Sequence, residues 1–467
     1  MRFDVYRRVR ILLSIMSATL LVGGLISFGE ETYPPTQIGL SYHDNADALT
    51  QKALSSTYGF DRLAEMCDRF GPRFSGSATL EQAIDWALGE MVKDGFSNVR
   101  GEPVMVPRWI RGEESLTLVS PRDKPCSMLG LGGSVGTGPD GITAEVLVVQ
   151  SFEELKEKQD QAKGKIVLFN APFTEYGATV VFRVRGAIEA AKVGAVASLI
   201  RSVGPFSMQT PHTGMMSYDA EVPRIPHAAI TLEDAMLLAR MQERGELLRV
   251  KLHMEAQNME PSLSRNVVAE IPGVESPDEI VLISGHIDSW DVGQGAMDDG
   301  GGCLAMWEAA RLILKSGLRP RRTIRIVLWT NEENGMAGVR TYRDQHQEAL
   351  VDHVLAIESD TGTFKPQGFS FTGSEKAMPY LEAIGSLLEP IEAQRLKWGA
   401  GASDIMRLVP DGVPVMGLDV DRTKYFWYHH TDADTMDKLD VKEFNQCVAA
   451  SAVMTWIVAD MPLRLPQ

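Results

Sequence analysis

From Asn266 onward the sequence alternates short apolar stretches with longer amphipathic ones, and this alternation limits the possible fold more than any other feature. The apolar stretches at 279–286 and 323–330 predict buried strands, and residues 301–317 between them predict a helix. Strands that are apolar throughout and separated by helices are typical of a largely parallel sheet with helices on both faces. We therefore predict an α/β fold built on a mixed, largely parallel sheet.

Further elements of this half follow from the same pattern. Residues 266–273 and 279–286 are expected to be neighbouring strands. The remaining predicted strands lie at 354–360, 368–374 and 413–420, and the remaining helices at 338–350 and 441–460.

The N-terminal half differs in texture, and a chain of 467 residues is long enough for two domains. Residues 46–98 have helical periodicity with a break at 71–76. Residues 116–258 contain short β-rich stretches, loops rich in glycine, proline and serine, and one helical stretch at 184–194. We predict that 46–115 is the N-terminal part of a catalytic domain, 116–258 an inserted β-rich domain, and 259–467 the rest of the catalytic domain.

The first 29 residues have the pattern of a signal peptide. Four arginines lie within residues 1–10, and a mostly apolar stretch follows at 11–28. Retention of 11–28 as an anchor remains an alternative, because its length is borderline for a membrane span. Both interpretations predict entry into the secretory pathway, and cleavage would leave the protein without stable membrane insertion.

Charge and cysteine content exclude some functions. The net charge of −16, with no compensating basic stripe, argues against a nucleic-acid partner. The four cysteines lie far apart without metal-binding spacing, so they leave open up to two disulfides. Cys303 lies in an apolar helical stretch and is expected to be a buried thiol.

Histidine and acidic residues follow several of the predicted strands. Residues at the carboxyl ends of parallel strands meet at one edge of a sheet. Nitrogen and carboxylate ligands without thiolate suit zinc or a similar metal in a catalytic role. The six candidates are His286, Asp298, Glu332, Glu333, Asp360 and His430.

Each candidate taken alone has an ordinary structural explanation. A single histidine at a strand end, a glycine-rich turn around Asp298, and a polar loop at Glu332 and Glu333 are all common. Asp288, two residues after His286, is expected to hold the imidazole and set its tautomer. Only one of the two adjacent glutamates is needed as a metal ligand, so the other can act as a general base. The ordered set therefore indicates a hydrolytic metal site.

The sequence resembles the co-catalytic zinc exopeptidase family, which includes bacterial aminopeptidases and glutamate carboxypeptidase II. The resemblance runs from about residue 45 to the C-terminus. It includes GITAEVLVV, GKIVLFN and EAAKVGAVASLIRS in the region of the predicted inserted domain. The motifs that carry it in the second half are SGHIDSWDVGQGAMDDGGG, IRIVLWTNEE, ESDTGTF, FTGSEKA and KYFWYHH.

The resemblance implies two zinc ions per subunit, small peptide substrates and a zinc exopeptidase fold. Asp298 would bridge the ions, and Glu332 would act as general base by taking a proton from water to give the hydroxide that the ions share. The implied ligands are His286 and Asp360 for one ion, and Glu333 and His430 for the other. The preferred substrates would be dipeptides with unblocked termini.

Further expectations rest on the same resemblance. They are a propeptide region at 30–45, a protease-associated-like cap at 116–258, a homodimer, and a secreted, endoplasmic reticulum, Golgi or lysosomal location. A cis peptide bond is expected between Asp298 and Asp299, and His429 is expected to donate a hydrogen bond to the oxyanion. Apart from the resemblance, the polar and aromatic residues at 211–218 indicate either a contact between cap and cleft that would limit access to short peptides, or an ordinary surface loop.

Two alternatives have the same fold. A glutaminyl cyclase-like transferase would use a single zinc ion, and a non-catalytic receptor would have lost ligands. The complete set of six candidate residues disfavours both, and the number of bound metal ions separates them from the exopeptidase.

Overall fold

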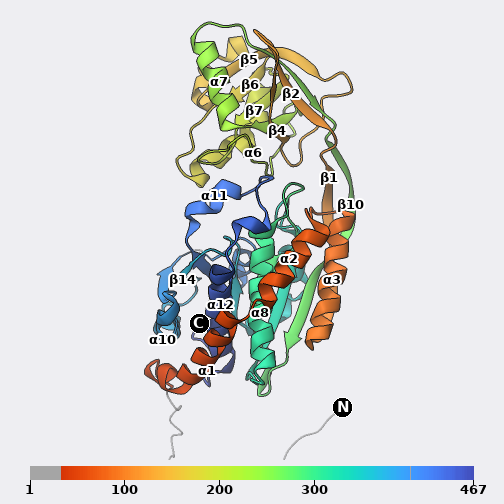
Figure 1. Ribbon diagram of the computed structural model, residues 1–467. Helices are drawn as coiled ribbons and strands as arrows, with labels where there is room; N and C mark the ends of the chain where they lie inside the picture. Colours follow the sequence, from red (N-terminus) through yellow and green to blue (C-terminus); the bar gives the residue numbers. More distant parts are fainter. Residues whose placement is uncertain (1–32, 400) are drawn as a thin grey trace, which may run out of the picture.

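The computed structural model describes residues 33–399 and 401–467, which form two lobes, each with its own eight-stranded sheet (Figure 1). The long strands β1 and β10 run from the larger lobe toward the smaller one (Figure 1). The predicted signal peptide at 1–29 lies outside the described residues. Among the residues that are described, no helix is both long enough and apolar enough to cross a membrane.

The sheet of the larger lobe has the order β1-β10-β12-β11-β13-β16-β14-β15. The four strands β12, β11, β13 and β16 are mutually parallel, whereas β1, β10 and β14 pair with antiparallel neighbours. This arrangement confirms the predicted mixed α/β fold. The strands are β1 (Ser97–Ile110), β10 (Gln257–Ile271), β11 (Ser276–His286), β12 (Arg322–Trp329), β13 (His353–Glu358), β14 (Pro366–Thr372), β15 (Arg395–Trp398) and β16 (Val415–Val420).

One expectation about strand order is wrong. Residues 266–273 and 279–286 are not neighbours, because β12 lies between β10 and β11. The chain leaves β11, forms helix α8 (Gly301–Lys315), and returns as β12 parallel to β11. Such a crossover decides which strand occupies the middle position, and local apolar patterning carries no information about that choice.

Helices cover both faces of this sheet, as β12 shows. Ile324, Ile326 and Leu328 belong to the core beneath α8 and α12, whereas Val327 and Trp329 face the core that contains α9. Alternation with a period of two therefore buries both sides of one strand. The helices of this lobe are α1 (Thr36–Ser55), α2 (Tyr58–Phe70), α3 (Ala78–Asp94), α8, α9 (Ala337–Gln345), α10 (Met378–Ser386), α11 (Tyr425–Tyr428) and α12 (Val441–Asp460).

Helix α1 begins at Thr36, ten residues before the helical region that the periodicity predicts. Ile38 and Tyr42 are buried in the main core, and the Tyr42 hydroxyl donates a hydrogen bond to Asp460 at the end of α12 (3.1 Å). Part of the region predicted as a propeptide, 30–45, therefore packs into this lobe.

The smaller lobe contains more helix than its sequence suggests. Helix α7 was not predicted, although Thr231 caps it by accepting a hydrogen bond from the Asp234 backbone N–H (3.2 Å). Its sheet has the order β3-β2-β9-β5-β6-β7-β8-β4. The elements are β2 (Glu114–Ser120), β3 (Lys124–Cys126), β4 (Met128–Gly130), β5 (Ile142–Val149), α4 (Phe152–Glu157), α5 (Gln159–Ala162), β6 (Ile166–Phe169), α6 (Tyr176–Lys192), β7 (Ala197–Arg201), β8 (His227–Ile230), α7 (Leu232–Glu243) and β9 (Arg249–Met254).

His353, at the start of β13, is fully buried as a neutral imidazole. Its Nδ1–H donates to the Ala349 carbonyl oxygen (2.9 Å), and its Nε2 accepts from the Tyr342 hydroxyl (2.9 Å). Burial lowers the pKa of His353 to about 4, whereas the ordinary value is 6.5. The unfolded chain therefore binds one more proton than the folded protein between these two values.

This difference makes His353 an acid-sensitive element of the fold. Its stabilising contribution is complete above pH 6.5 and is lost as the pH falls toward 4. We expect the stability difference between wild type and His353→Gln to shrink by about 2 kcal/mol between pH 7 and pH 5. Urea unfolding of wild type and His353→Gln at several pH values measures this difference in the free energy of unfolding. A difference that is constant with pH would show that His353 has an ordinary pKa.

Candidate metal centre

The candidate residues meet at the carboxyl ends of the parallel strands of the larger lobe. His286 is the last residue of β11, while Glu332 and Glu333 follow β12 and Asp360 follows β13. Loops from elsewhere in the lobe bring Asp298 and His430 to the same edge. The structure therefore brings the six candidates together, as the positions of the strand ends predicted.

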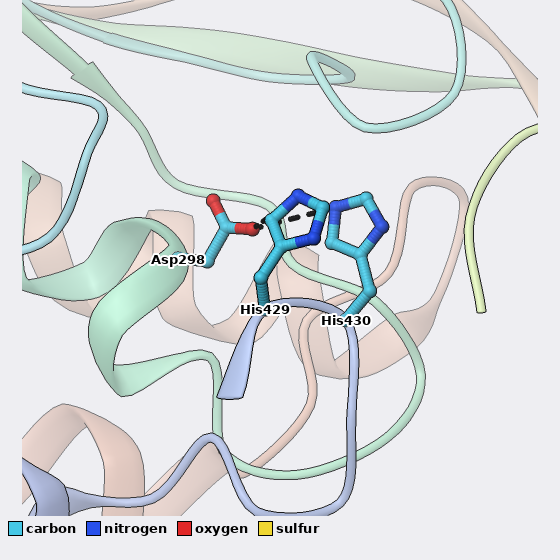
Figure 2. A group of neighbouring side chains, drawn as sticks. All are labelled: Asp298, His429 and His430. Atoms are coloured by element: carbon cyan, nitrogen blue, oxygen red, sulfur yellow. Dashed lines mark ion pairs between the residues drawn. The ribbon is translucent and has the colours of Figure 1, made fainter. Parts of the chain in front are cut away.

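Asp298 lies between two pairs of potential ligands. Its Oδ1 is 3.3 Å from His286 Nε2, which is also 3.2 Å from Asp360 Oδ1. Its Oδ2 is 3.4 Å from His430 Nε2, which is 3.0 Å from Glu333 Oε2. Figure 2 shows the Asp298 carboxylate directed toward the imidazole rings of His429 and His430. One carboxylate thus offers a separate oxygen to each pair, which is the arrangement that a bridging ligand requires.

Backbone carbonyl groups set the tautomers of both histidines. His286 Nδ1–H donates to the Asp288 carbonyl oxygen (2.9 Å), and His430 Nδ1–H donates to the Thr213 carbonyl oxygen (3.3 Å). Each Nε2 is therefore left with a lone pair directed at carboxylate oxygens. That arrangement is repulsive unless a proton or a cation lies between them.

Asp288 holds the His286 imidazole as predicted, but through its backbone carbonyl oxygen, because its carboxylate Oδ1 lies 3.8 Å from Nδ1. The Asp288 carboxylate instead accepts hydrogen bonds from the backbone N–H groups of Glu332 (3.0 Å) and Glu333 (3.3 Å) and from the Ser75 hydroxyl (3.1 Å). Residue spacing placed Asp288 correctly near the site. Only the folded loop shows that its carboxylate orients the two glutamates.

Asp288→Asn should weaken this loop, because an amide group cannot accept at both positions. We expect metal affinity to fall about 10–100-fold, the usual cost of losing a residue that orients ligands. Equilibrium dialysis against a zinc buffer measures the affinity. Asp278→Asn, at the exposed start of β11, the strand that leads to Asp288, is the matched control and should bind metal like wild type. Equal affinity in both variants would contradict the role of Asp288.

Two further buried acids hold the Asp298 turn. Asp434 accepts hydrogen bonds from the backbone N–H groups of Met297 (2.6 Å) and Asp298 (3.1 Å). Asp299 accepts from the His286 N–H (3.1 Å) and the Gly302 N–H (3.2 Å). A Cβ atom at Gly302 would lie 2.2 Å from Asp299 Oδ1, so this position requires glycine. The Asp298–Asp299 peptide bond is cis, as predicted.

The buried charges of the centre are unbalanced without cations. Burial, together with Asp360, raises the pKa of Glu332 well above its usual range. Burial, partly offset by His430, raises the pKa of Glu333 to about 7. Asp298 Oδ2 and Glu333 Oε1 are buried without a hydrogen-bond partner among the described residues. Imidazole and carboxylate donors with unsatisfied oxygens fit zinc or a similar divalent metal.

An open cleft of about 520 Å³ lies beside these residues, and Glu332 and His429 line it. His429 stacks on His430 with ring centroids 3.5 Å apart, and its Nε2 is 3.7 Å from Asp298 Oδ2. Burial and the neighbouring His430 hold the pKa of His429 well below its usual range. His429 is therefore a neutral imidazole whose ring N–H can donate a hydrogen bond.

Tyr425, in α11, also lines the cleft and was not predicted as a site residue. Burial and nearby carboxylates, Asp298 first among them, raise the pKa of Tyr425 well above its usual range. Its phenol therefore stays protonated and can donate. The only signal in the sequence was a tyrosine five residues before the candidate ligand His430.

The smaller lobe contributes to the site, which its sequence did not indicate residue by residue. Thr213 N–H donates to the His430 carbonyl oxygen (2.9 Å), and His212 Nδ1–H donates to the His429 carbonyl oxygen (2.8 Å). Arg183 donates to the Thr213 carbonyl oxygen (3.4 Å). The predicted contact of 211–218 with the cleft is confirmed, and these residues also hold the histidine pair in place.

The fold and the site together define a metal-dependent hydrolase, and comparison with known proteins agrees. Residues 266–455 match peptidase family M28. Carboxypeptidase Q from Bos taurus is 50% identical over 90% of this chain and 89% of its own length. Carboxypeptidase Q from Homo sapiens is 49% identical over 90% of this chain and 89% of its own.

Solved structures give the same assignment. A peptidase M28 precursor from Shewanella amazonensis is 36% identical, with a TM-score of 0.87 over 91% of this chain and 98% of its own. A zinc aminopeptidase from Bacillus subtilis shares the fold at 19% identity and a TM-score of 0.66, over 87% of this chain and 96% of its own. The chain belongs to peptidase family M28, which confirms the predicted enzyme class.

Proposed function

We propose that the protein is an exopeptidase that binds two zinc ions per subunit and hydrolyses small peptides, chiefly dipeptides with unblocked termini. The observation that carries this proposal is the position of Asp298, with one oxygen 3.3 Å from His286 Nε2 and the other 3.4 Å from His430 Nε2. A site for a single ion would not need a carboxylate shared between two histidine and carboxylate pairs. The names of the relatives, carboxypeptidase Q and zinc aminopeptidase, support the metal and the reaction.

In this proposal, His286 and Asp360 would hold one ion, Glu333 and His430 would hold the other, and Asp298 would bridge them. Zinc ions, when bound there, polarise the scissile carbonyl group and make water a usable nucleophile near neutral pH. Asp288 keeps Glu332 and Glu333 in their orientation through their backbone N–H groups.

Glu332 is the proposed general base. Both glutamates line the cleft, but Glu333 Oε2 lies 3.0 Å from His430 Nε2, whereas Glu332 has no such histidine contact among the described residues. Glu332 takes a proton from the attacking water and later delivers it to the leaving amine. Burial, together with the neighbouring Asp360, raises the pKa of Glu332, so its carboxylate binds the proton that it takes from the water.

Tyr425 and His429 are the proposed donors to the oxyanion of the tetrahedral intermediate. Both line the cleft, and both keep their protons at neutral pH. Donors that are already oriented in a site with little water stabilise a developing negative charge strongly. Their positions in the cleft wall support this role, because no rearrangement of the fold is needed to bring them there.

Hydrolysis of a dipeptide panel by zinc-loaded protein tests the function. Each dipeptide is compared with its N-acetylated and C-terminally amidated forms, and zinc is counted by elemental analysis. We expect two ions per chain and turnover that requires free termini. A single ion with cyclisation of N-terminal glutamine would support a glutaminyl cyclase-like transferase. Fewer than two ions without turnover of any peptide would support a receptor.

We also propose that the protein is a homodimer that acts in the secretory pathway or outside the cell. The basic and apolar pattern of residues 1–29 supports the location. Light scattering of the purified protein tests the assembly. Fractionation of cells that express the full chain tests the location, and protein confined to the cytoplasm would contradict it.

A further inference from the structure

The cleft beside the metal centre differs in chemistry from one part to another. Tyr176 and Phe426 stack with ring centroids 5.0 Å apart and give one part an aromatic wall. Another part is lined by Met336 and by the arginines Arg340 and Arg407. A bound peptide would therefore meet aromatic surface in one part, where the Arg183 guanidinium donates to the Tyr176 hydroxyl (2.8 Å), and Met336 with two arginines in the other.

Arg407 has no acidic partner among residues 33–399 and 401–467. Its Nε and Nη2 donate only to the Met336 sulfur, at 3.3 and 3.2 Å. A thioether is a weak acceptor, so it satisfies a guanidinium group poorly. Arg343 shows the contrast, because its guanidinium is paired with the Asp411 carboxylate (Nη2 to Oδ1, 3.2 Å). Arg407 thus keeps its donors for another acceptor.

The contact with Met336 places Arg407 on the same side of the cleft as Glu332. Gly335 N–H donates to the Glu332 carbonyl oxygen (3.3 Å), so Met336 follows directly on the turn that carries the glutamate. Arg340 lies one helical turn further on, and its N–H donates to the Met336 carbonyl oxygen (3.3 Å). Arg407 and Arg340 thus both contact Met336, the residue that follows the Glu332 turn.

We propose that Arg407 binds the free α-carboxylate of the C-terminal residue of the substrate, with Arg340 adding positive charge. This inference rests on the proposed exopeptidase function. In a dipeptide, the leaving amine and the terminal carboxylate are attached to the same carbon atom. A group that binds the carboxylate on the Glu332 side therefore holds the leaving amine close to the proton that Glu332 delivers.

Charge explains what such a residue supplies. The net charge of the chain is −16, so arginines beside the cleft give an anionic peptide end a local region of positive charge. A planar guanidinium can form two parallel charge-assisted hydrogen bonds with a carboxylate. Amidation of the peptide removes the negative charge and with it most of this interaction.

The test compares phenylalanyl-alanine with its C-terminal amide on zinc-loaded enzyme. Wild type should prefer the free acid. Arg407→Met should lower kcat/KM for the free acid about 10- to 100-fold, the usual range for a hydrogen bond to a charged group, and change the value for the amide less than about threefold. Arg407→Lys should lie between these, because lysine keeps the charge without the planar pair of donors.

Arg343→Met is the matched control, because the Arg343 guanidinium is paired with Asp411 and is not among the described residues that line the cleft. It should affect acid and amide equally. Zinc content and thermal unfolding are measured for each variant. If Arg407→Met does not fold, Arg407→Lys is used in its place. A larger loss of kcat/KM for the free acid than for the amide supports the inference, and an equal loss for both contradicts it.

Two results would overturn the inference while the proposed function stands. One is wild-type enzyme that hydrolyses the acid and the amide equally well. The other is an Arg407 variant with normal zinc content that loses activity equally on both. Wild-type enzyme that binds two zinc ions and hydrolyses neither peptide contradicts the proposed function itself, and the inference falls with it.

Discussion

Glu332→Gln is expected to lower kcat about 10²–10⁴-fold while both metal ions stay bound, because a glutamine side chain cannot accept the proton of the attacking water. The backbone N–H of residue 332 still donates to Asp288, so the loop should keep its shape. Steady-state kinetics and elemental analysis on the same preparation measure the two quantities.

Glu333→Gln is the matched control, since it changes the neighbouring carboxylate in the same way. Glu333 lies 3.0 Å from His430 Nε2, so this variant should lose metal as well as activity. If Glu332→Gln loses zinc and Glu333→Gln keeps it, the roles of the two glutamates are exchanged.

Removal of the metal ions should abolish turnover and lower the stability of the fold. Buried carboxylates such as Asp298 and Glu333 then lack a compensating charge. At zinc concentrations about 100-fold above the dissociation constant, each site should stabilise the folded protein by about 2.7 kcal/mol. Thermal unfolding and peptide hydrolysis before and after chelation measure both effects.

Added zinc should restore activity and stability, whereas magnesium should not, because two of the proposed ligands are imidazole nitrogens. Metal-free protein with undiminished turnover would contradict a metal-dependent reaction. Recovery of full activity with one equivalent of zinc would contradict a centre of two ions.

Much of the larger lobe was predictable from its sequence. The predicted helix at 441–460 is α12, and the predicted strand at 323–330 is β12, whose two faces are both buried. These elements are encoded locally, in the spacing of apolar residues. The order of the strands is not, because β12 reaches its place between β10 and β11 only through the crossover that contains α8.

The smaller lobe shows which contacts could not be predicted from residue patterns. Residues 211–218 were expected to contact the cleft, but no pattern indicated that Thr213 exchanges hydrogen bonds with His430 through both its N–H and its carbonyl oxygen. Deleting this lobe would therefore disturb the position of His430 as well as widen the cleft. A deletion variant would consequently not separate the limit on substrate size from the integrity of the metal centre.

The sequence by itself determined the class of fold, the six candidate site residues and the kind of chemistry, because strand ends and residue types are local properties. The tertiary structure alone decided that Asp298 presents one oxygen to each histidine and that Asp288 orients the loop of Glu332. It also decided that Tyr425 lines the cleft and that Arg407 is left without an acidic partner. The physical reason is that these relations join residues far apart in the chain, and only the packing of the folded protein sets their distances.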